Sequence, residues 1–428
     1  MSAARLLAVW LGLGVVCFPG GASADPGDLD PSFGSGGKVR VSLSGRNDSA
    51  VRMVVQDDGK IVTIGTGDRG NERDLLLARF LADGSVDESF GDRGRVFFGF
   101  KEKTERGAAI ALQSDGAIVV ASQVEKGDDT ARMLVARFKP DGSYDQGFGQ
   151  KGRVTTAFDG TYVSPSAVLV MGGGEIVVGG EGFVGGLSAS DHQRVWVLAR
   201  YRADGRLDRS FGKGGRVVLP MGNGLGALVA QDDGKLVAGG SAGPGAVDFA
   251  VARLLLDGGL DATFGDGGIV RTSFSADNDY LHGLVIDSAG RIIAAGRSWK
   301  NFEPDVAVVR YLSDGTPDPS FGSDGKVTTD VGFDGNEAYG IVLGPDGRIV
   351  VAGWAHLNRQ TQFALLRYRE DGSLDPSFGV GGVVATPIGR FAAIATDVQL
   401  QGPDRIVACG WAANGRSFSD IVLARYEW

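Results

Sequence analysis

A frame made of a Phe-Gly pair, a Gly four residues after the Phe and a Val six residues after it recurs seven times along the chain. A repeat of this kind means that each unit is one small supersecondary structure, which buries its apolar surface against its neighbours. The frame therefore limits the architecture to an open stack or a closed ring of similar units. The anchors lie 53 to 63 residues apart, at Phe33, Phe90, Phe148, Phe211, Phe264, Phe321 and Phe378.

One repeat shows how each unit folds. Asp-Gly pairs at 58–59 and 83–84 separate apolar stretches, and such pairs favour tight hairpin turns because both positions tolerate positive φ. The repeat is thus predicted to form four antiparallel strands, which we take as blade 1 of the molecule. The expected strands are residues 49–56, 60–66, 74–80 and 85–98.

The apolar pattern of the second strands indicates how the units pack. Stretches such as KIVTIG, AIVVAS and RIVVAG are almost continuously apolar, which is typical of strands covered on both faces. Sheets stacked face to face around an axis meet this requirement, as in β-propellers. A helical interpretation fails because the apolar residues show no 3.6-residue period and because Gly and β-branched residues dominate.

The two ends of the chain distinguish a ring from an open stack. Residues 28–43 contain only the fourth strand of a repeat, whereas the last residues supply only the first three strands. An open stack would leave both ends as unpaired edges. We therefore predict a seven-bladed all-β propeller of four antiparallel strands per blade, in which residues 28–43 complete the last blade.

A second periodic feature supports this closure. An Arg on the third strand is followed eight residues later by an Asp, as in Arg79 and Asp87. The last such Arg, Arg425, has its equivalent Asp at Asp30, near the other end of the chain. We expect these residues to form structural ion pairs across the turn, with the pair Arg425–Asp30 closing the ring. Between the two lie Arg137/Asp145, Arg200/Asp208, Arg253/Asp261, Arg310/Asp318 and Arg367/Asp375.

The N-terminus has the pattern of a targeting segment. Arg5 precedes an apolar core at 6–18 and an Ala-Ser-Ala sequence at 22–24, so residues 1–24 are predicted to be a signal peptide. The mature chain, residues 25–428, is expected to be exported, periplasmic or extracellular, and not inserted in a membrane. It keeps one cysteine, Cys409, expected to be a buried thiol. A net charge of −9 argues against nucleic acid as a partner.

The repeat resembles a known family. Segments such as QDDGKIVTIG (56–65) and DGSLDPSFGVGGVV (371–384) are similar to the bacterial delta-60 repeat, and the similarity extends over residues 28–428. The resemblance implies a β-propeller in an exported protein. It implies no established activity and no catalytic residue. A looser resemblance to NHL-type propellers is the competing assignment.

Aromatic residues gather in the later repeats. Trp299, Trp354 and Trp411 are expected just after the second strands of blades 5, 6 and 7, and Tyr280 and Tyr339 just before the first strands of blades 5 and 6. Aromatic rings beside polar groups are typical of binding surfaces for sugars or proteins, although rings packed at the rim of the propeller would give the same pattern. The polar candidates among them are Asp279, Asn336 and His356.

These features favour an exported scaffold that binds a glycan or a protein. The alternatives are a polysaccharide-directed enzyme with carboxylates on the same face and a purely structural surface protein. The sequence contains no HExxH, no GxxxxGK[ST] and no paired-Cys motif. We therefore predict no catalytic residue, metal or cofactor.

Overall fold

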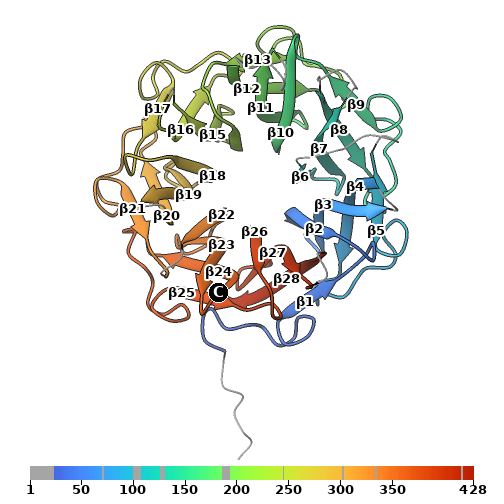
Figure 1. Cartoon of the computed structure of the whole chain (residues 1–428). Helices are drawn as coiled ribbons and strands as arrows, with labels where there is room; N and C mark the ends of the chain where they lie inside the picture. The colour runs from blue at the N-terminus through green and yellow to red at the C-terminus, as the bar shows by residue number, and fades with distance from the viewer. Residues whose placement is uncertain are drawn as a thin grey trace, which may run out of the picture.

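A computed structural model describes residues 24–69, 72–99, 108–125, 131–185, 193–243, 245–300, 303–332, 335–415 and 418–428. These residues form seven four-stranded antiparallel sheets arranged in a ring around a central axis (Figure 1). The described residues contain strands and turns but no helix. The predicted all-β, seven-bladed propeller is therefore confirmed.

The strands follow the repeat. Blades 1 to 3 consist of β2 (Asp48–Val55), β3 (Ile61–Arg69), β4 (Glu72–Phe80) and β5 (Arg95–Phe98); β6 (Ala108–Leu112), β7 (Ile118–Glu125), β8 (Ala131–Phe138) and β9 (Arg153–Thr156); and β10 (Thr161–Val170), β11 (Ile176–Val184), β12 (Gln193–Tyr201) and β13 (Arg216–Leu219). Blades 4 to 6 consist of β14 (Leu225–Ala230), β15 (Leu236–Ala242), β16 (Asp248–Leu254) and β17 (Ile269–Thr272); β18 (Asp279–Ile286), β19 (Ile292–Lys300), β20 (Glu303–Tyr311) and β21 (Lys326–Thr329); and β22 (Asn336–Leu343), β23 (Ile349–Leu357), β24 (Gln360–Tyr368) and β25 (Val383–Thr386).

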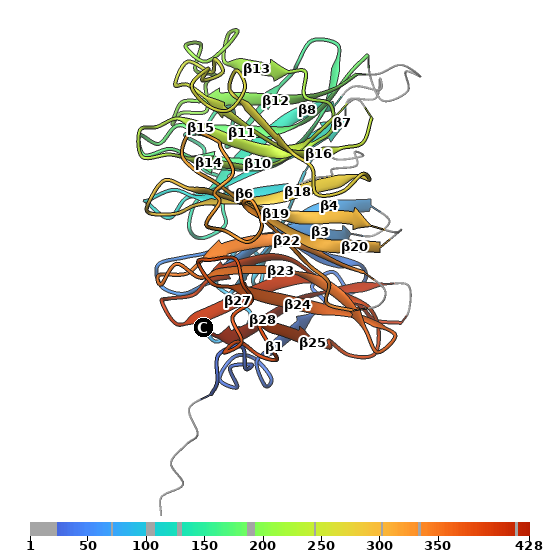
Figure 2. The same ribbon diagram turned by 90° about the vertical axis from the view of Figure 1, so that its left-hand side faces the viewer.

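Blade 7 joins the two ends of the chain. Its strands are β26 (Ala393–Leu400), β27 (Arg405–Ala413), β28 (Ser419–Glu427) and β1 (Lys38–Val41). β1 is the outer strand and pairs antiparallel with β28, from Lys38 opposite Ala424 to Val41 opposite Ile421. In the side view, the sheets of blades 4, 5 and 6 follow one another from top to bottom (Figure 2).

The fourth strands are shorter than expected. In blade 1 the predicted strand began at residue 85, but β5 begins at Arg95. The segment between the third and fourth strands consists mostly of turns, with isolated bridges from Phe80 to Val86 and from Gly91 and Asp92 to Arg95. The Phe-Gly frame thus belongs to the connection that leads into the outer strand.

The Phe anchors form part of the core between blades. All seven are fully buried, and Phe90, for example, packs with Leu77 of its own blade and with Val120 and Phe138 of the next. The predicted thiol of Cys409 is also buried, and burial raises its pKa. Because the apolar second strands lie between two neighbouring blades, both of their faces are covered, which explains their continuous hydrophobic character.

The repeated Arg connects each blade to the next. In blade 1 the Nε of Arg79 lies 2.8 Å from Oδ2 of Asp87, and the guanidinium carbon lies 4.6 Å from the centre of the Phe90 ring. Arg79 also donates to the carbonyl of Pro140 in the third-to-fourth turn of blade 2. The same arrangement joins Arg310 to Asp318, to Phe321 and to the carbonyl of Glu370.

The contact from blade 6 to blade 7 differs, because the third-to-fourth turn of blade 7 is where the two ends of the chain meet. There Arg367 pairs with Asp375 at 2.9 Å and lies 5.6 Å from the centre of the Trp428 ring. The backbone carbonyl of Pro26 accepts from the N–H of Gly379 at 2.9 Å. In blade 2 the corresponding carbonyl belongs to Asp141, which accepts from Gly91.

Six of the seven second strands carry a glycine at which the first strand comes unusually close. A Cβ built on Gly65, Gly353 or Gly410 would lie 1.8 to 2.0 Å from a carbonyl oxygen of the first strand. At the same level the register of the first strand shifts by one residue, as between Ala338 and Gly340. These glycines allow the close approach of the two backbones beside a β-bulge, and the second strand continues past them.

Candidate functional site

The inner strands surround a narrow central channel. Its cavity of about 210 Å³ is lined by residues of the first strands of all seven blades. Most of these residues are small or aliphatic, as at Ala109, Ala167 and Gly283. Larger polar side chains enter from few positions, and they include Arg52 and Asp397 on one side and His282 and Tyr339 on another.

The bulge residues of the inner strands link neighbouring blades. Thr396 of blade 7 donates from Oγ1 to the carbonyl of Ala50 in blade 1 at 3.0 Å, and Ser166 of blade 3 donates to the carbonyl of Leu225 in blade 4. His282 occupies the same position in blade 5, between the two residues where the register shifts. It contacts a side chain of blade 6 instead of a carbonyl.

That side chain is Glu337 of β22, which is only 2% exposed. Its Oε1 lies 2.8 Å from Nε2 of His282, and its Oε2 lies 2.8 Å from Nη1 of Arg297. The hydroxyl of Tyr339 also donates to Oε2, at 3.0 Å. Two residues of blade 5 and one of blade 6 thus surround one buried carboxylate.

The surrounding groups keep this carboxylate ionised. Burial alone would raise the pKa of Glu337, but the hydrogen bond and charge of His282 and the charge of Arg297 outweigh it and lower that pKa. An ionised carboxylate only accepts hydrogen bonds, so Nε2 of His282 carries the proton that the contact requires. Burial and the neighbouring Glu337 raise the pKa of Tyr339 to about 12.

Aromatic rings also lie beside Arg297 and Glu337. The guanidinium carbon of Arg297 lies 4.6 Å from the ring centre of Tyr280 and 5.5 Å from that of Trp299. Trp354 is the cross-strand partner of Glu337. We call these seven residues the Glu337 cluster: Tyr280, His282, Arg297, Trp299, Glu337, Tyr339 and Trp354.

The structure therefore brings four of the predicted candidates together, Tyr280, Trp299, Tyr339 and Trp354. Their expected positions relative to the strands were wrong. The tryptophans lie within β19 and β23 because these strands continue past the close-approach glycine, and both tyrosines lie within their first strands. Trp299 also lies two positions farther along its strand than Trp354, since the residue that matches Trp354 in blade 5 is Arg297.

The other four candidates lie elsewhere. Asp279 and Asn336 are fully buried: Asp279 accepts from the backbone N–H of Phe274 at 2.7 Å, and Asn336 accepts from that of Val306 at 2.9 Å. Burial raises the pKa of Asp279. Both side chains hold backbone in place and face no solvent.

His356 and Trp411 are half-buried. His356 lies two residues beyond Trp354 on β23, with Nδ1 3.2 Å from the hydroxyl of Thr361. Trp411, on β27 and not after it, pairs with Ile394 and Ile421, so apolar neighbours replace Glu337 in blade 7.

Sequence reasoning did not select the centre of the cluster. Glu337, His282 and Arg297 belong to adjacent blades, and the contacts to Glu337 span 55 and 40 positions. The one available signal was the charge of Glu337, since the matching residues of the other inner strands include Ser49, Tyr280 and Ile394.

The described residues contain no group of three or more His, Cys, Asp or Glu side chains arranged to hold a metal ion. Within the same residues, no helix has the length and apolar character needed to cross a membrane.

Comparison with known proteins supports the fold. Six stretches match a family model described as "Domain of unknown function (DUF5122) beta-propeller", at residues 56–90, 113–148, 174–211, 231–264, 290–321 and 344–378. No curated protein matches the chain.

Solved structures with a similar arrangement are distant. A protein of unknown function from Dyadobacter fermentans is 11% identical with a TM-score of 0.47, covering 77% of this chain and 96% of its own. The polysaccharide lyase Uly1 is 12% identical with a TM-score of 0.44, covering 88% and 90%. Drosophila Plexin A, in complex with Semaphorin 1b, is 9% identical with a TM-score of 0.45, covering 94% and 88%.

At these scores the likenesses carry no argument about activity. The matched repeats agree with the seven closed blades, and the chain is similar to this β-propeller repeat family over six of its repeats.

Proposed function

We propose that this protein is an exported binding scaffold, and that the Glu337 cluster binds a glycan or a protein segment at the blade 5–6 side of the channel. The observation that carries the proposal is the arrangement around Glu337, where a buried carboxylate fixes Arg297, His282 and Tyr339. The export of the protein rests on the predicted signal peptide at residues 1–24.

The arrangement suits binding because the groups are held before a ligand arrives. Arg297 is fixed at one end by Glu337 and stacks beside Tyr280 and Trp299, so these side chains would lose little freedom on binding. The side chains of Arg297 and His282 remain 24% and 25% exposed, and Tyr280 and Trp299 are half-buried, so part of the cluster reaches solvent. Aromatic faces next to fixed donors are typical of sites that bind sugars and of protein hot spots.

The same geometry disfavours an enzyme that uses this carboxylate. Glycoside hydrolysis requires two carboxyl groups that face the substrate about 5–10 Å apart. Both oxygens of Glu337 are occupied by partners, and its depressed pKa opposes proton donation at neutral pH. Asp397, on another side of the channel, is also buried, and its Oδ2 accepts from the N–H of Met53 at 2.9 Å.

The test is a glycan-array screen of residues 25–428 together with two variants. Tyr280→Ala/Trp299→Ala removes the rings beside Arg297, and Trp411→Ala removes a half-buried tryptophan outside the cluster. We expect bound glycans to be lost by the first variant and kept by the second, with both variants folded by circular dichroism.

If the folded protein binds no glycan on the array, a glycan is excluded as the ligand and a protein segment becomes the expected partner. Equal loss in both variants would contradict the assignment of the site to the Glu337 cluster.

A further inference from the structure

A basic groove lies at the outer part of the ring between blades 2 and 3. Its cavity of about 1250 Å³ is formed by β9, by the third-to-fourth turn of blade 3 and by the start of β13. The described residues lining it include a single acidic side chain, Asp204, and no aromatic one. We call it the arginine groove after its five arginines: Arg153, Arg202, Arg206, Arg209 and Arg216.

The repeat does not require this charge. Arg206 stands where blade 2 has Ser143, and Arg209 stands where blade 2 has Gln146 and blade 1 has Glu88. At the position of Arg202, blade 1 has Leu81 and blade 2 has Lys139. The structural Arg of this blade is Arg200, which pairs with Asp208 at 2.8 Å, so the groove arginines are additional to the ion pair that the fold uses.

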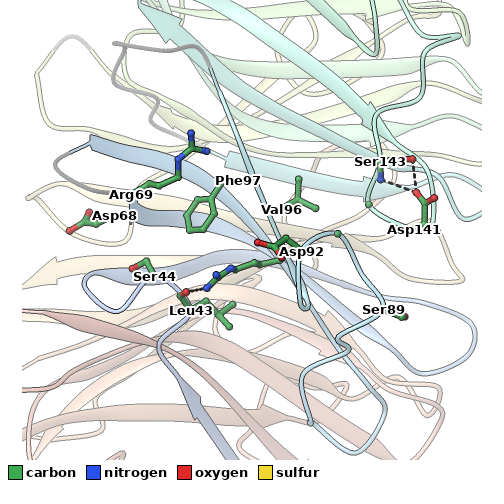
Figure 3. A pocket seen from close by; sticks show the side chains of 13 residues that line it. Leu43, Ser44, Asp68, Arg69, Ser89, Asp92, Val96, Phe97, Asp141 and Ser143 are labelled. Atoms are coloured by element: carbon green, nitrogen blue, oxygen red, sulfur yellow. Dashed lines mark hydrogen bonds between the residues drawn. The ribbon is translucent and has the colours of Figure 1, made fainter.

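The matching groove between blades 1 and 2 provides a comparison inside the same molecule. Its cavity of about 730 Å³ shares two of these parts, β5 and the third-to-fourth turn of blade 2, and is also lined by the connection before β2 and the end of β3 (Figure 3). Asp141 and Ser143 project from that turn, across the groove from Asp68 and Arg69 (Figure 3). The charged lining residues are three aspartates, including Asp92, and two arginines, Arg69 and Arg95. Related grooves therefore carry a slight negative excess in one case and a strong positive excess in the other.

Three of the groove arginines are accessible to a ligand. Arg202, Arg206 and Arg209 are exposed, and within the described residues only Arg206 has a carboxylate partner, Asp204 at 3.4 Å. Nε of Arg216 is buried without a hydrogen-bond partner in the described part of the chain, as is Nε of Arg95 at the matching position of blade 1. The positive charges that line this groove repel one another, and a bound anion would relieve that repulsion.

We propose that the arginine groove binds an acidic polysaccharide through its sulfate or carboxylate groups. The planar guanidinium matches such oxyanions with two parallel hydrogen bonds, which favours Arg over Lys at sites of this kind. A single-stranded nucleic acid would require aromatic rings for stacking, and the lining residues provide none. A duplex would extend from the groove onto an acidic surface, such as the neighbouring groove with Asp92 and Asp141.

The test measures binding of residues 25–428 to immobilised dextran sulfate and polygalacturonate, with neutral dextran as the uncharged control. The variant Arg206→Ser/Arg209→Gln introduces the residues that blade 2 carries at these positions, so the fold is expected to tolerate it. Arg69→Gln removes an exposed arginine from the matching groove and serves as the charge control.

We expect one or both acidic polymers to bind at low salt and to dissociate as salt rises, since exposed charge interactions are screened. The double variant should lose about tenfold or more in affinity, because two charge-assisted contacts are removed. Arg69→Gln and Tyr280→Ala/Trp299→Ala should bind like the parent, which separates this site from the Glu337 cluster.

Three results would overturn the proposal. They are no binding of either acidic polymer at low salt, equal binding by the double variant, and tighter binding of a single-stranded oligonucleotide than of either polymer. The reciprocal variant Asp92→Gln/Ser143→Arg should improve binding in the first groove of a chain whose arginine groove has been neutralised.

Discussion

Nε of Arg425 lies 2.8 Å from Oδ2 of Asp30, although the two residues are 395 positions apart. Arg425 also donates to the hydroxyl of Ser32 at 2.9 Å and to the side chain of Gln401 at 2.6 Å. In the other six blades the corresponding Arg and Asp belong to one continuous hairpin, eight positions apart. The closing blade thus reproduces with two chain ends the contact that its neighbours make within one hairpin.

Arg425→Ala should destabilise the protein by roughly 3–5 kcal/mol, because it removes the more buried of the two arginines that pair with Asp30 and leaves Ser32 and Gln401 without their partner. Equilibrium urea unfolding measures the loss. Arg69→Ala is the control, since Arg69 is 67% exposed in its pair with Asp74 and should cost only about 0–1 kcal/mol. Equal midpoints for the two variants would contradict a buried closing pair.

The Arg425–Asp30 pair should also make the free energy of unfolding depend on pH. Burial tends to raise the pKa of Asp30, but hydrogen bonds from Ser32 and Arg405 and the charge of Arg425 lower it from 3.8 to about 2. A depressed carboxyl pKa stabilises the fold above the unfolded value, and this stabilisation is lost as pH falls through the folded value.

The free energy of unfolding of the parent should therefore exceed that of Asp30→Asn by a margin that is constant above about pH 5. This margin should shrink by roughly 2 kcal/mol between pH 4 and pH 2. Urea titrations at a series of pH values test this. A margin that does not change with pH would show that Asp30 keeps its ordinary pKa.

Phe90→Ala should cost roughly 3–5 kcal/mol, because the ring is fully buried between two blades and its removal leaves a cavity. The matched control is Phe391→Ala, where the ring is 46% exposed. Thermal and urea unfolding of both variants give the comparison. A loss below about 1 kcal/mol for Phe90→Ala would mean that the anchor is not a core residue.

Gly344 and Trp428 should show strong coupling. A Cβ built on Gly344 would lie 1.8 Å from the ring of Trp428, so Gly344→Ala forces that ring away from Arg367 and Asp346. We expect a loss of about 1–3 kcal/mol in the parent and a much smaller loss in a Trp428→Ala background. A double-mutant cycle by urea unfolding measures the coupling, and additive effects would contradict the contact.

The fold was predictable because its determinants are local and repeated. The Asp-Gly turns, the Phe anchors and the eight-residue Arg-to-Asp interval each lie within one repeat, and seven copies reinforce the interpretation. The closure of the ring was also predictable from the sequence, because Asp30 is the equivalent of the Asp that follows each of the other six arginines by eight residues. The length of the outer strand was not predictable, since residues 85–94 contain no Pro and no Asp-Gly pair that would mark where the turns end and the strand begins.

The candidate site was only half predictable. The aromatic residues were visible as a departure from the repeat, but the register of Trp299 and Trp354 depends on bulges that leave no periodic signal. In the sequence, a glycine such as Gly353 suggests that a strand ends there. In the structure the strand continues, and the glycine permits the Glu337 carbonyl to lie close to its backbone. The central role of Glu337 depends on contacts between blades, which no pattern within one repeat encodes.

The closed ring, in which the repeated arginines connect each blade to the next, determines where local unfolding can begin. In an open repeat array the terminal unit has one neighbour, so melting starts at the ends and spreads inward. Here each blade has neighbours on both sides, and any blade that opens must break two interfaces at once. Hydrogen exchange in the inner strands should therefore be slow and nearly uniform around the circle, with its fastest sector beside Arg367, where a tryptophan ring takes the place of a carbonyl.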